Sequence, residues 1–441
     1  MKIFNLGPIK EGEVKFNDMI IIWGMNNSGK TMLTYLLYAI QEEFRKYLFK
    51  FSNTHIDGVY YYEIINSGKK ITISMDEIYS LYNDFQKYFE DKAQTILSEY
   101  FSIDQSYFSN FSIKFDENEI YNAIPIKRKK SRGFHRQRVE GQIVQSTFEL
   151  AKSNAGYEFR LLKQNTDIEF MDEEDHTPSK KTLNFSLESF DNYLSGFFKF
   201  MTNRAKNIYF PAERIGINQF REELNSYRAP DNDFLISKST RTSNHPKPIE
   251  DYINLMFGIE YRDKSERYME ELSDLIDGEF IYNEDTDDFE YKNKLMPKSV
   301  PFKVISSSLK SLFGIEEYLR RTKMLNSSSI IIDEPEMNLH PTKQVEIIDF
   351  FTKLIMDNGI SMILSTHSSY ITRKLLNLLI ENENFPEQSK SISKENVNIY
   401  EIKEGKIKQI DLIESQDFIE NFDTVSLALD EEYYKLIGVE E

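Results

Sequence analysis

Residues 24–31 read GMNNSGKT and fit the pattern G-x-x-x-x-G-K-[ST]. In this pattern backbone N–H groups surround phosphate, the lysine reaches the terminal phosphates and the last hydroxyl binds Mg²⁺. The apolar run 19–23 predicts a buried strand before the loop. Apolar residues spaced three and four apart between positions 33 and 44 predict a helix after it. Because this chemistry requires a strand, a loop and a helix in that order, we expect a nucleotide site formed by Gly24, Asn26, Asn27, Ser28, Gly29, Lys30 and Thr31.

A second segment, SSSIIIDEPEMNLHP at 327–341, places acids at the end of a β-branched run. Asp333 ends the predicted strand, where it holds Mg²⁺ directly or through water. Glu334 follows at once and is placed to polarise the attacking water as a general base. We therefore expect Thr31 and Asp333 to be metal ligands and Glu334 to be catalytic.

A third strand, residues 361–364, ends in the polar residues Ser-Thr-His-Ser. A lone histidine is usually structural. His367 stands at a strand end in a chain that already carries two phosphate-chemistry motifs, so we interpret it as the catalytic residue that senses the γ-phosphate.

Together these motifs resemble those of ABC-type ATPases of the SMC/RecF/OLD-like branch, in which D-E-P-E-x-x-L-H-P is followed by S-T-H-S. Transporter ATPases typically read D-E-P-T-x-x-L-D instead. The resemblance implies an α/β fold, an ABC-type P-loop ATPase head with a mixed sheet, split by a helical and β insertion. It also implies that ATP and Mg²⁺ are bound.

The resemblance implies a signature segment, L-S-G-G-Q or S-S-G-x-[KR] in the family. Ser306 matches the signature serine and Lys310 the basic position, whereas Ser308 stands where the family usually has glycine. In the implied head-to-tail dimer, two ATP molecules lie between the subunits, and the signature serine of one subunit caps the γ-phosphate bound by the other. Ser306, Ser307 and Ser308 are therefore added to the expected nucleotide-binding residues.

Residues 207–214, NIYFPAER, resemble the Y-x-P-A-x-R strand end of OLD-like and anti-phage ATPases. Two interpretations of Arg214 stay open. It lies near the nucleotide or a neighbouring subunit, or it is a solvated or salt-bridged arginine after a strand.

The motifs predict a discontinuous head. Residues 1–75 form its N-terminal part, 76–206 an insert that serves as an arm, sensor or docking region, and 207–441 its C-terminal part, with an irregular insert at 215–300. Within these parts we expect helices at 76–101 and 187–206. We expect hairpins of 59–65 with 69–73, 279–282 with 289–292, and 397–402 with 407–410. The acids between 283 and 288 favour a hairpin tip over a metal site.

The composition of the chain limits where the protein can be located and what it can bind. The chain has 441 residues, no cysteine and a net charge of −18. It shows no signal peptide and no apolar run of the ~18 residues that a membrane helix needs, so we expect a cytoplasmic protein that does not enter a membrane. A basic run stands out against this acidity, and nucleic acid, an acidic protein or plain solvation explain it equally well. Its charged residues are Lys127, Arg128, Lys129, Lys130, Arg132, Arg136 and Arg138.

ATPase-only chains of this length resemble the ATPase subunits of bacterial anti-phage systems, such as PtuA of Septu and AriA of PARIS. The resemblance implies an ATP-hydrolysing switch and scaffold that forms homo-oligomers, senses DNA or a phage protein, and acts with a separate effector, a nuclease or toxin. No nuclease module is detected, because the chain after His367 contains no D-x-D pair. Two alternatives stay open: a RecF-like repair ATPase that binds DNA directly, and a scaffold that holds ATP with little turnover.

Overall fold

The computed structural model describes residues 1–55, 71–116, 130–139, 142–153, 156–165, 207–221, 245–257, 269–283, 285–286, 288–296, 298–321, 329–358, 360–385, 391–411 and 434. Of these, 48–55, 71–79, 130–139, 142–153, 156–165, 257, 269, 321 and 358 are described by their backbone alone. The chain forms two compact units, each discontinuous in sequence. Unit 1 contains Met1–Tyr38, Gln94–Ser112 and Ala205–Glu441, and unit 2 contains Ala39–Ala93 and Ile113–Arg204.

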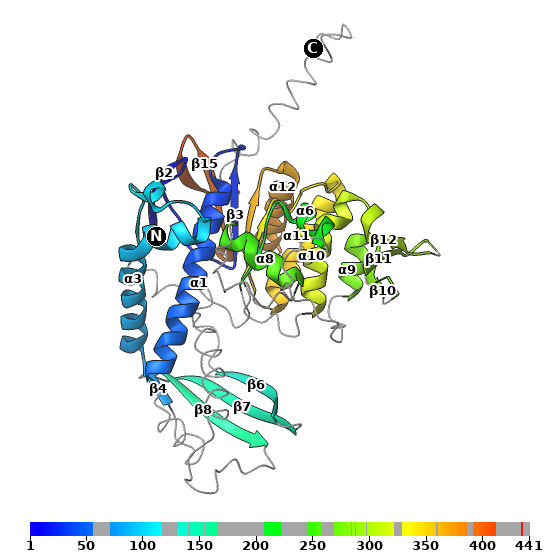
Figure 1. The fold of residues 1–441 in the computed structure, drawn as a ribbon. Coiled ribbons are helices and arrows are strands. Elements are labelled where there is room, and N and C mark those ends of the chain that lie inside the picture. The colour runs from blue at the N-terminus through cyan, green and yellow to red at the C-terminus, as the bar shows by residue number, and fades with distance from the viewer. Residues whose placement is uncertain are drawn as a thin grey trace, which may run out of the picture. The chain divides into compact units, whose positions relative to one another are not determined.

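A nine-stranded mixed sheet organises unit 1, in the order β5-β1-β2-β16-β15-β3-β14-β13-β9 (Figure 1). Strands β15, β3, β14, β13 and β9 are parallel, whereas β1 with β2 and β15 with β16 are antiparallel pairs. The predicted α/β fold with a mixed sheet is thus confirmed. The strands are β1 Lys2–Leu6, β2 Ile9–Glu13, β3 Met19–Gly24, β5 Ser112–Lys114, β9 Ile208–Phe210, β13 Ser329–Asp333, β14 Ser361–Thr366, β15 Val397–Lys403 and β16 Lys406–Ile410.

The parallel strands are buried on both faces, which explains their continuous apolar runs. Side chains alternate between the faces with period two. On β9, Ile208 and Phe210 join the main core, whereas Tyr209 packs edge-on against Tyr35 of the helix α1 Lys30–His55. The main core also takes in residues of α8 Lys247–Phe257, α9 Met269–Ile276, α10 Ser307–Arg321, α11 Pro341–Asn358 and α12 Ser369–Asn384.

The C-terminal hairpin, β15 and β16, has the predicted strands. Its place in the sheet is central, because β15 pairs with β3 and β16 pairs with β2. It therefore joins the β1–β2 hairpin to the parallel strands, so the first and last parts of the chain share one sheet.

The predicted hairpin of the second insert is also present. Strands β10 Gly278–Asn283 and β11 Asp288–Asn293 pair with each other, and β12 Val300–Pro301 follows in a three-stranded sheet. Phe280 and Phe289 of this sheet pack against Phe313 of α10 with ring centroids 5.0 and 4.8 Å apart. Nowhere in the described residues do three or more His, Cys, Asp or Glu side chains gather to hold a metal.

Unit 2 contains a four-stranded antiparallel sheet in the order β4-β8-β7-β6. Its strands are β4 Ile71–Ser74, β6 Lys130–Val139, β7 Gln142–Ser153 and β8 Gly156–Asn165. The hairpin expected at 59–73 lies largely outside the described residues, and β4 pairs with β8. The helix expected at 187–206 also lies outside them.

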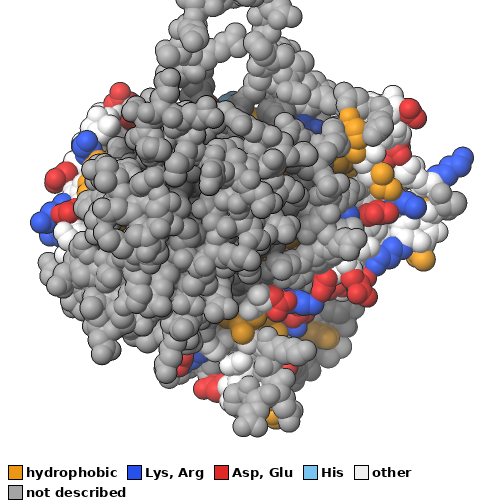
Figure 2. Space-filling view, turned by 90° about the horizontal axis from the view of Figure 1, so that it is seen from below, with side chains coloured by type: hydrophobic (Ala, Val, Ile, Leu, Met, Phe, Trp, Pro, Cys, Tyr) orange, Lys and Arg blue, Asp and Glu red, His pale blue; other side chains and the backbone are white. Residues whose placement is uncertain are grey.

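The two long helices are α1 Lys30–His55 and α3 Met75–Phe101, the latter close to the predicted 76–101, and each contributes residues to both units. In unit 2 they meet through aromatic side chains, and Phe44 of α1 lies 4.7 Å from Phe85 of α3 between ring centroids. Among the described helices, none is long and apolar enough to cross a membrane. In Figure 2 the described Lys, Arg, Asp and Glu side chains are interspersed, not separated by sign.

Candidate ATP-binding and hydrolysis site

The glycine-rich loop lies where β3 ends and α1 begins, as the pattern predicts. Asn27 (φ 63°) and Gly29 (φ 104°) take left-handed backbone conformations, which occur in the backbone turns that bind anions. A Cβ atom at Gly24 would lie 2.9 Å from the backbone oxygen of Ile402 on β15. The neighbouring strand therefore leaves no room for a side chain at Gly24.

An open pocket of about 620 Å³ lies over this loop. Among the described residues it is lined by Pro8, Asn26, Asn27, Gly29, Lys30, Thr31, Met32 and Glu334. The Lys30 ammonium donates hydrogen bonds to the carbonyl oxygens of Gly24 (2.8 Å) and Met25 (3.1 Å). Burial lowers the pKa of Lys30, and the charges of Glu334, Asp333 and Glu336 oppose this shift. The lysine is thus held at the loop by neutral acceptors, for which phosphate oxygens are stronger substitutes.

Asp333 ends β13 and is 2% exposed. Burial raises its pKa, whereas hydrogen bonds from the hydroxyls of Ser365, Tyr209 and Thr31 lower it. Because Thr31 is among the groups that lower the pKa of Asp333, the two side chains expected to hold a metal lie near each other. A hydroxyl and a carboxylate supply the hard oxygen ligands that Mg²⁺ prefers beside phosphate oxygens, so this pair fits a Mg–nucleotide.

Glu334 follows Asp333 with a left-handed backbone conformation, φ 49°. Its N–H donates to the carbonyl oxygen of Ser365 on the adjacent strand β14 (3.0 Å), and its side chain lines the pocket. The chain therefore leaves the sheet at this residue and turns its carboxylate toward the space above Lys30 and Thr31.

His367 follows β14 and is half-exposed. Its Nδ1 atom lies 3.6 Å from Glu334 and 3.4 Å from Glu336. Glu336 is 5% exposed and accepts hydrogen bonds from the Thr366 hydroxyl (2.7 Å) and the His367 N–H (2.9 Å). Sequence reasoning missed Glu336. The only local signal was a second carboxylate after Pro335, and nothing in the motif showed that it would reach across to β14.

The three serines that the resemblance assigns to the signature lie elsewhere in unit 1. Ser306 precedes α10, is exposed, and its hydroxyl lies 2.9 Å from that of Ser308. The Leu309 N–H donates to the Ser306 hydroxyl at 3.4 Å, so Ser306 acts as a cap of α10. None of Ser306, Ser307 and Ser308 is among the described residues that line the pocket over the loop.

For Arg214, the structure contradicts the interpretation as a solvated or salt-bridged arginine, and it places the side chain beside the acidic segment of the candidate site. Arg214 begins the short helix α6 Arg214–Gln219 and is fully buried. Its guanidinium donates to the backbone carbonyls of Pro211, Ser311, Asp333 and Glu334 at 2.7–3.1 Å. It is therefore neither solvated nor held by a salt bridge, and it contacts the backbone of the acidic segment instead of lining the pocket.

The basic run lies only partly in the described chain. Lys127, Arg128 and Lys129 are outside it, whereas Lys130, Arg132, Arg136 and Arg138 stand on β6, which pairs with β7. The side chains of β6 are not among those described. Part of the basic run therefore forms a strand. The solvated loop that is one interpretation of the sequence does not describe the whole run.

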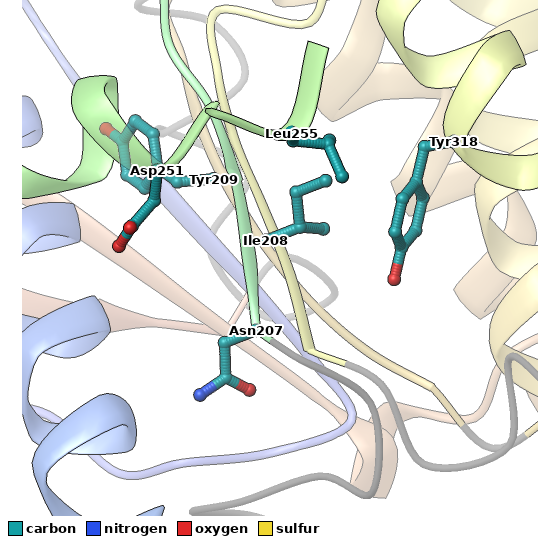
Figure 3. Close-up of a pocket in the computed structure, with 6 residues that line it drawn as sticks. All are labelled: Asn207, Ile208, Tyr209, Asp251, Leu255 and Tyr318. Carbon is teal, nitrogen blue, oxygen red and sulfur yellow. The ribbon is translucent and has the colours of Figure 1, made fainter. Parts of the chain in front are cut away.

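A second, small pocket lies at the opposite, amino end of β9 (Figure 3). Asn207, Asp251 and Tyr318 bring polar groups to it, and among the described residues neither polar atom of the buried Asn207 amide has a hydrogen-bond partner. Asp251 accepts a hydrogen bond from Tyr38 of α1 (2.8 Å). Because nucleotides bind at the carboxyl ends of parallel strands, this pocket is separate from the site described above.

With loop, acids and histidine at one edge of a parallel sheet, the chain has the geometry of a P-loop ATPase. The family of AAA ATPase domains matches residues 1–372, and the chain belongs to this family.

Similar solved structures include SMC head domains. One, bound to the C-winged helix domain of ScpA, shares 8% identity and covers 94% of this chain and 98% of its own, with a TM-score of 0.35. The SMC head domain from Thermotoga maritima shares 10% identity over 93% of this chain and 98% of its own, with a TM-score of 0.33. An SMC head domain from Pyrococcus furiosus, with an extended coiled coil and bound to the C-terminal domain of ScpA, shares 11% identity. It covers 96% of this chain and 98% of its own, with a TM-score of 0.32. No curated protein sequence matches this chain.

Proposed function

We propose that the chain hydrolyses Mg-ATP and uses the resulting opening and closing of a dimer as a switch. The observation that carries the hydrolysis step is the placement of Glu334 in the wall of the same pocket as Lys30 and Thr31. These residues come from segments 300 positions apart in the chain, yet the adjacent strands β3, β14 and β13 end at one edge and bring them together.

In this proposal the loop N–H groups and Lys30 bind the phosphates, and Thr31 and Asp333 hold Mg²⁺, which neutralises charge on the phosphate oxygens. Glu334 accepts the proton of the attacking water. His367 contacts the γ-phosphate, and Glu336 orients it through the backbone N–H of His367 and the hydroxyl of Thr366.

Two substitutions test hydrolysis. Glu334→Gln retains shape and removes the base, so we expect kcat to fall on the order of 10²- to 10⁴-fold while ATP binding persists. Lys30→Ala removes the cation that binds the phosphates, so we expect ATP binding itself to fail. Phosphate release and binding of a fluorescent ATP analogue measure these two effects. A Lys30→Ala variant that binds and hydrolyses ATP like the parent would rule the site out.

We propose further that ATP closes a head-to-tail dimer in which Ser306 of one subunit meets the nucleotide of the other. The exposure of Ser306 and its position outside its own subunit's pocket support this arrangement. Mass photometry of Glu334→Gln with Mg-ATP should show twice the 52.1 kDa monomer, and Ser306→Arg should prevent the doubling. A monomer at saturating Mg-ATP contradicts dimer closure.

The biological setting that we propose is anti-phage defence, with this chain as scaffold and sensor for a separate nuclease or toxin. It rests on the similarity of the motifs at 207–214, 333–341 and 365–368 to those of anti-phage ATPases. Pull-down of Glu334→Gln from the native host, with and without Mg-ATP, tests it. A co-purifying effector whose retention follows ATP supports the proposal, and a chain that is recovered alone in both conditions speaks against it.

A second candidate, a RecF-like ATPase that binds DNA directly, is favoured by the basic run. That run holds seven Lys or Arg residues between positions 127 and 138 and no acid. DNA should then stimulate ATP hydrolysis, with a steep salt dependence that disappears when these residues are neutralised. ATP hydrolysis that is indifferent to DNA at low salt excludes this candidate.

A further inference from the structure

Arg214 is a fully buried charged side chain that contacts the carbonyl oxygens of both acids in the site. One terminal nitrogen donates to the carbonyl of Asp333 at 2.7 Å, and the other donates to that of Glu334 at 2.7 Å. These bonds hold the two peptide groups at which the chain leaves β13 and adopts the left-handed turn at Glu334. The direction of the Glu334 carboxylate therefore depends on the position of this guanidinium.

The same guanidinium also contacts α10, the helix that follows the signature serine. Its Nε atom donates to the carbonyl of Ser311 at 3.1 Å. Because a guanidinium is planar and its donors have a fixed geometry, a shift of α10 either moves the carbonyls at 333 and 334 or breaks a buried hydrogen bond. A buried donor left without a partner is costly, so concerted movement is favoured.

A comparison with Asn218, which lies on the same helix α6, distinguishes coupling of α10 to the acidic segment from simple structural support of α10. The side-chain N–H of Asn218 donates to the carbonyl of Lys310 at 2.9 Å, and its oxygen accepts from the Tyr252 hydroxyl at 2.8 Å. Asn218 thus fastens the same turn of α10 from the same helix, α6. The described contacts of its side chain do not include the acidic segment.

We propose that Arg214 is a positioning residue that couples the signature helix α10 to Glu334, so that movement of α10 on nucleotide-driven closure sets the placement of the general base. The proposal rests on the ATP-driven closure proposed above. It adds that, within one subunit, the Arg214 side chain links the movement of α10 on closure to the position of the catalytic carboxylate.

Hydrogen exchange tests the coupling without requiring turnover. Three proteins are compared with and without Mg-ATP: Glu334→Gln, the same with Arg214→Lys, and the same with Asn218→Ala as the matched control. In the parent and the control, ATP should protect the loop at 24–31, the helix at 307–321 and the turn at 333–339. With Arg214→Lys the first two should stay protected, and protection of 333–339 should fall at least fivefold.

Turnover supplies a second readout in the chain with Glu334 intact. Arg214→Lys keeps the positive charge, but a single ammonium group cannot donate to carbonyls that lie in three directions. We therefore expect kcat to fall at least tenfold, while the affinity for ATP changes less than threefold. Asn218→Ala should lower kcat less than threefold. Arg214→Met provides a second variant, and its melting temperature shows whether it folds.

The outcomes separate this inference from the proposed function. If all three segments lose protection equally, or if the Arg214 variants no longer bind ATP, Arg214 only supports the folded structure. Either result would overturn the proposed coupling. Unchanged protection at 333–339 would overturn it as well. If ATP protects all three segments but the parent chain shows no turnover, hydrolysis fails while loss of protection at 333–339 in Arg214→Lys still supports the coupling.

Discussion

At the scale of single residues, the site depends on a buried acid whose ionisation works against folding. Burial raises the pKa of Asp333, so the folded chain binds this proton more tightly than the unfolded chain. The contribution of the group to stability is full below its ordinary pKa and declines as pH rises toward the raised value. In the metal-free protein, the ionised carboxylate therefore costs stability at neutral pH.

We expect Asp333→Asn to increase the free energy of unfolding of nucleotide-free, EDTA-treated protein at pH 7, although it removes the metal ligand. The increase should shrink as the pH falls through the raised pKa of Asp333, because the native carboxyl then takes up its proton. The hydroxyls of Ser365, Tyr209 and Thr31 can reorient to suit an amide. Urea unfolding along a pH series measures the effect, and a gain of the same size at every pH contradicts the explanation.

Glu336 yields a second prediction at this scale. It orients His367 through the Thr366 hydroxyl and the His367 N–H. Glu336→Gln keeps the size but not the charge, so we expect kcat to fall on the order of 10-fold, the scale of partners that orient a functional group, with little change in ATP affinity. Glu346→Gln, at an ion pair with Lys343, is the matched control. Equal kcat values in the two variants would remove Glu336 from the mechanism.

At the scale of elements, α10 is packed so closely that a glycine in its middle is required. A Cβ atom at Gly314 would lie 2.1 Å from the Tyr252 hydroxyl oxygen, whereas a Cβ atom at Gly216 in α6 would meet nothing within 4 Å. Helix propensity favours alanine over glycine at both positions by about 0.8–1 kcal/mol. Overpacking in a core costs about 1–3 kcal/mol, which outweighs that gain at Gly314.

Substitution of the two glycines by alanine should therefore change the free energy of unfolding in opposite directions. We expect Gly314→Ala to destabilise the chain by about 1–2 kcal/mol net, and Gly216→Ala to stabilise it by about 0.5–1 kcal/mol. Chemical denaturation of both variants decides the matter. Stabilisation by Gly314→Ala would mean that Tyr252 and α10 are not packed as described.

At the scale of the whole molecule, the nucleotide pocket joins distant parts of unit 1. Pro8 from the β1–β2 turn, the loop before α1 and Glu334 after β13 all line it. A ligand that binds only the folded state stabilises it by about 2.7 kcal/mol at 100 times its Kd. We expect this increase with Mg-ATP in Glu334→Gln and none in Lys30→Ala. Equal stabilisation of both variants would place the nucleotide elsewhere.

The sequence by itself determined the elements around each motif, because strand and helix periodicity and the glycine-rich loop are local in the chain. Its resemblance to ABC-type ATPases implied the α/β class with a mixed sheet, and its strand patterns predicted the hairpins of 279–282 with 289–292 and of 397–402 with 407–410. What the tertiary structure decided depends on contacts between segments far apart. The order of the sheet brings Lys30, Thr31, Asp333, Glu334 and His367 to one edge.

The roles of Arg214 and Glu336 emerged only from the tertiary structure. Arg214 donates to backbone carbonyls, and every residue in a chain has one, so no residue type marks its partners in the sequence. Glu336 lies in the turn after β13 and accepts from the Thr366 hydroxyl at the end of β14 and from the His367 N–H just after it, which requires the register of β13 and β14. A local pattern specifies which groups are present, whereas long-range packing specifies which of them meet.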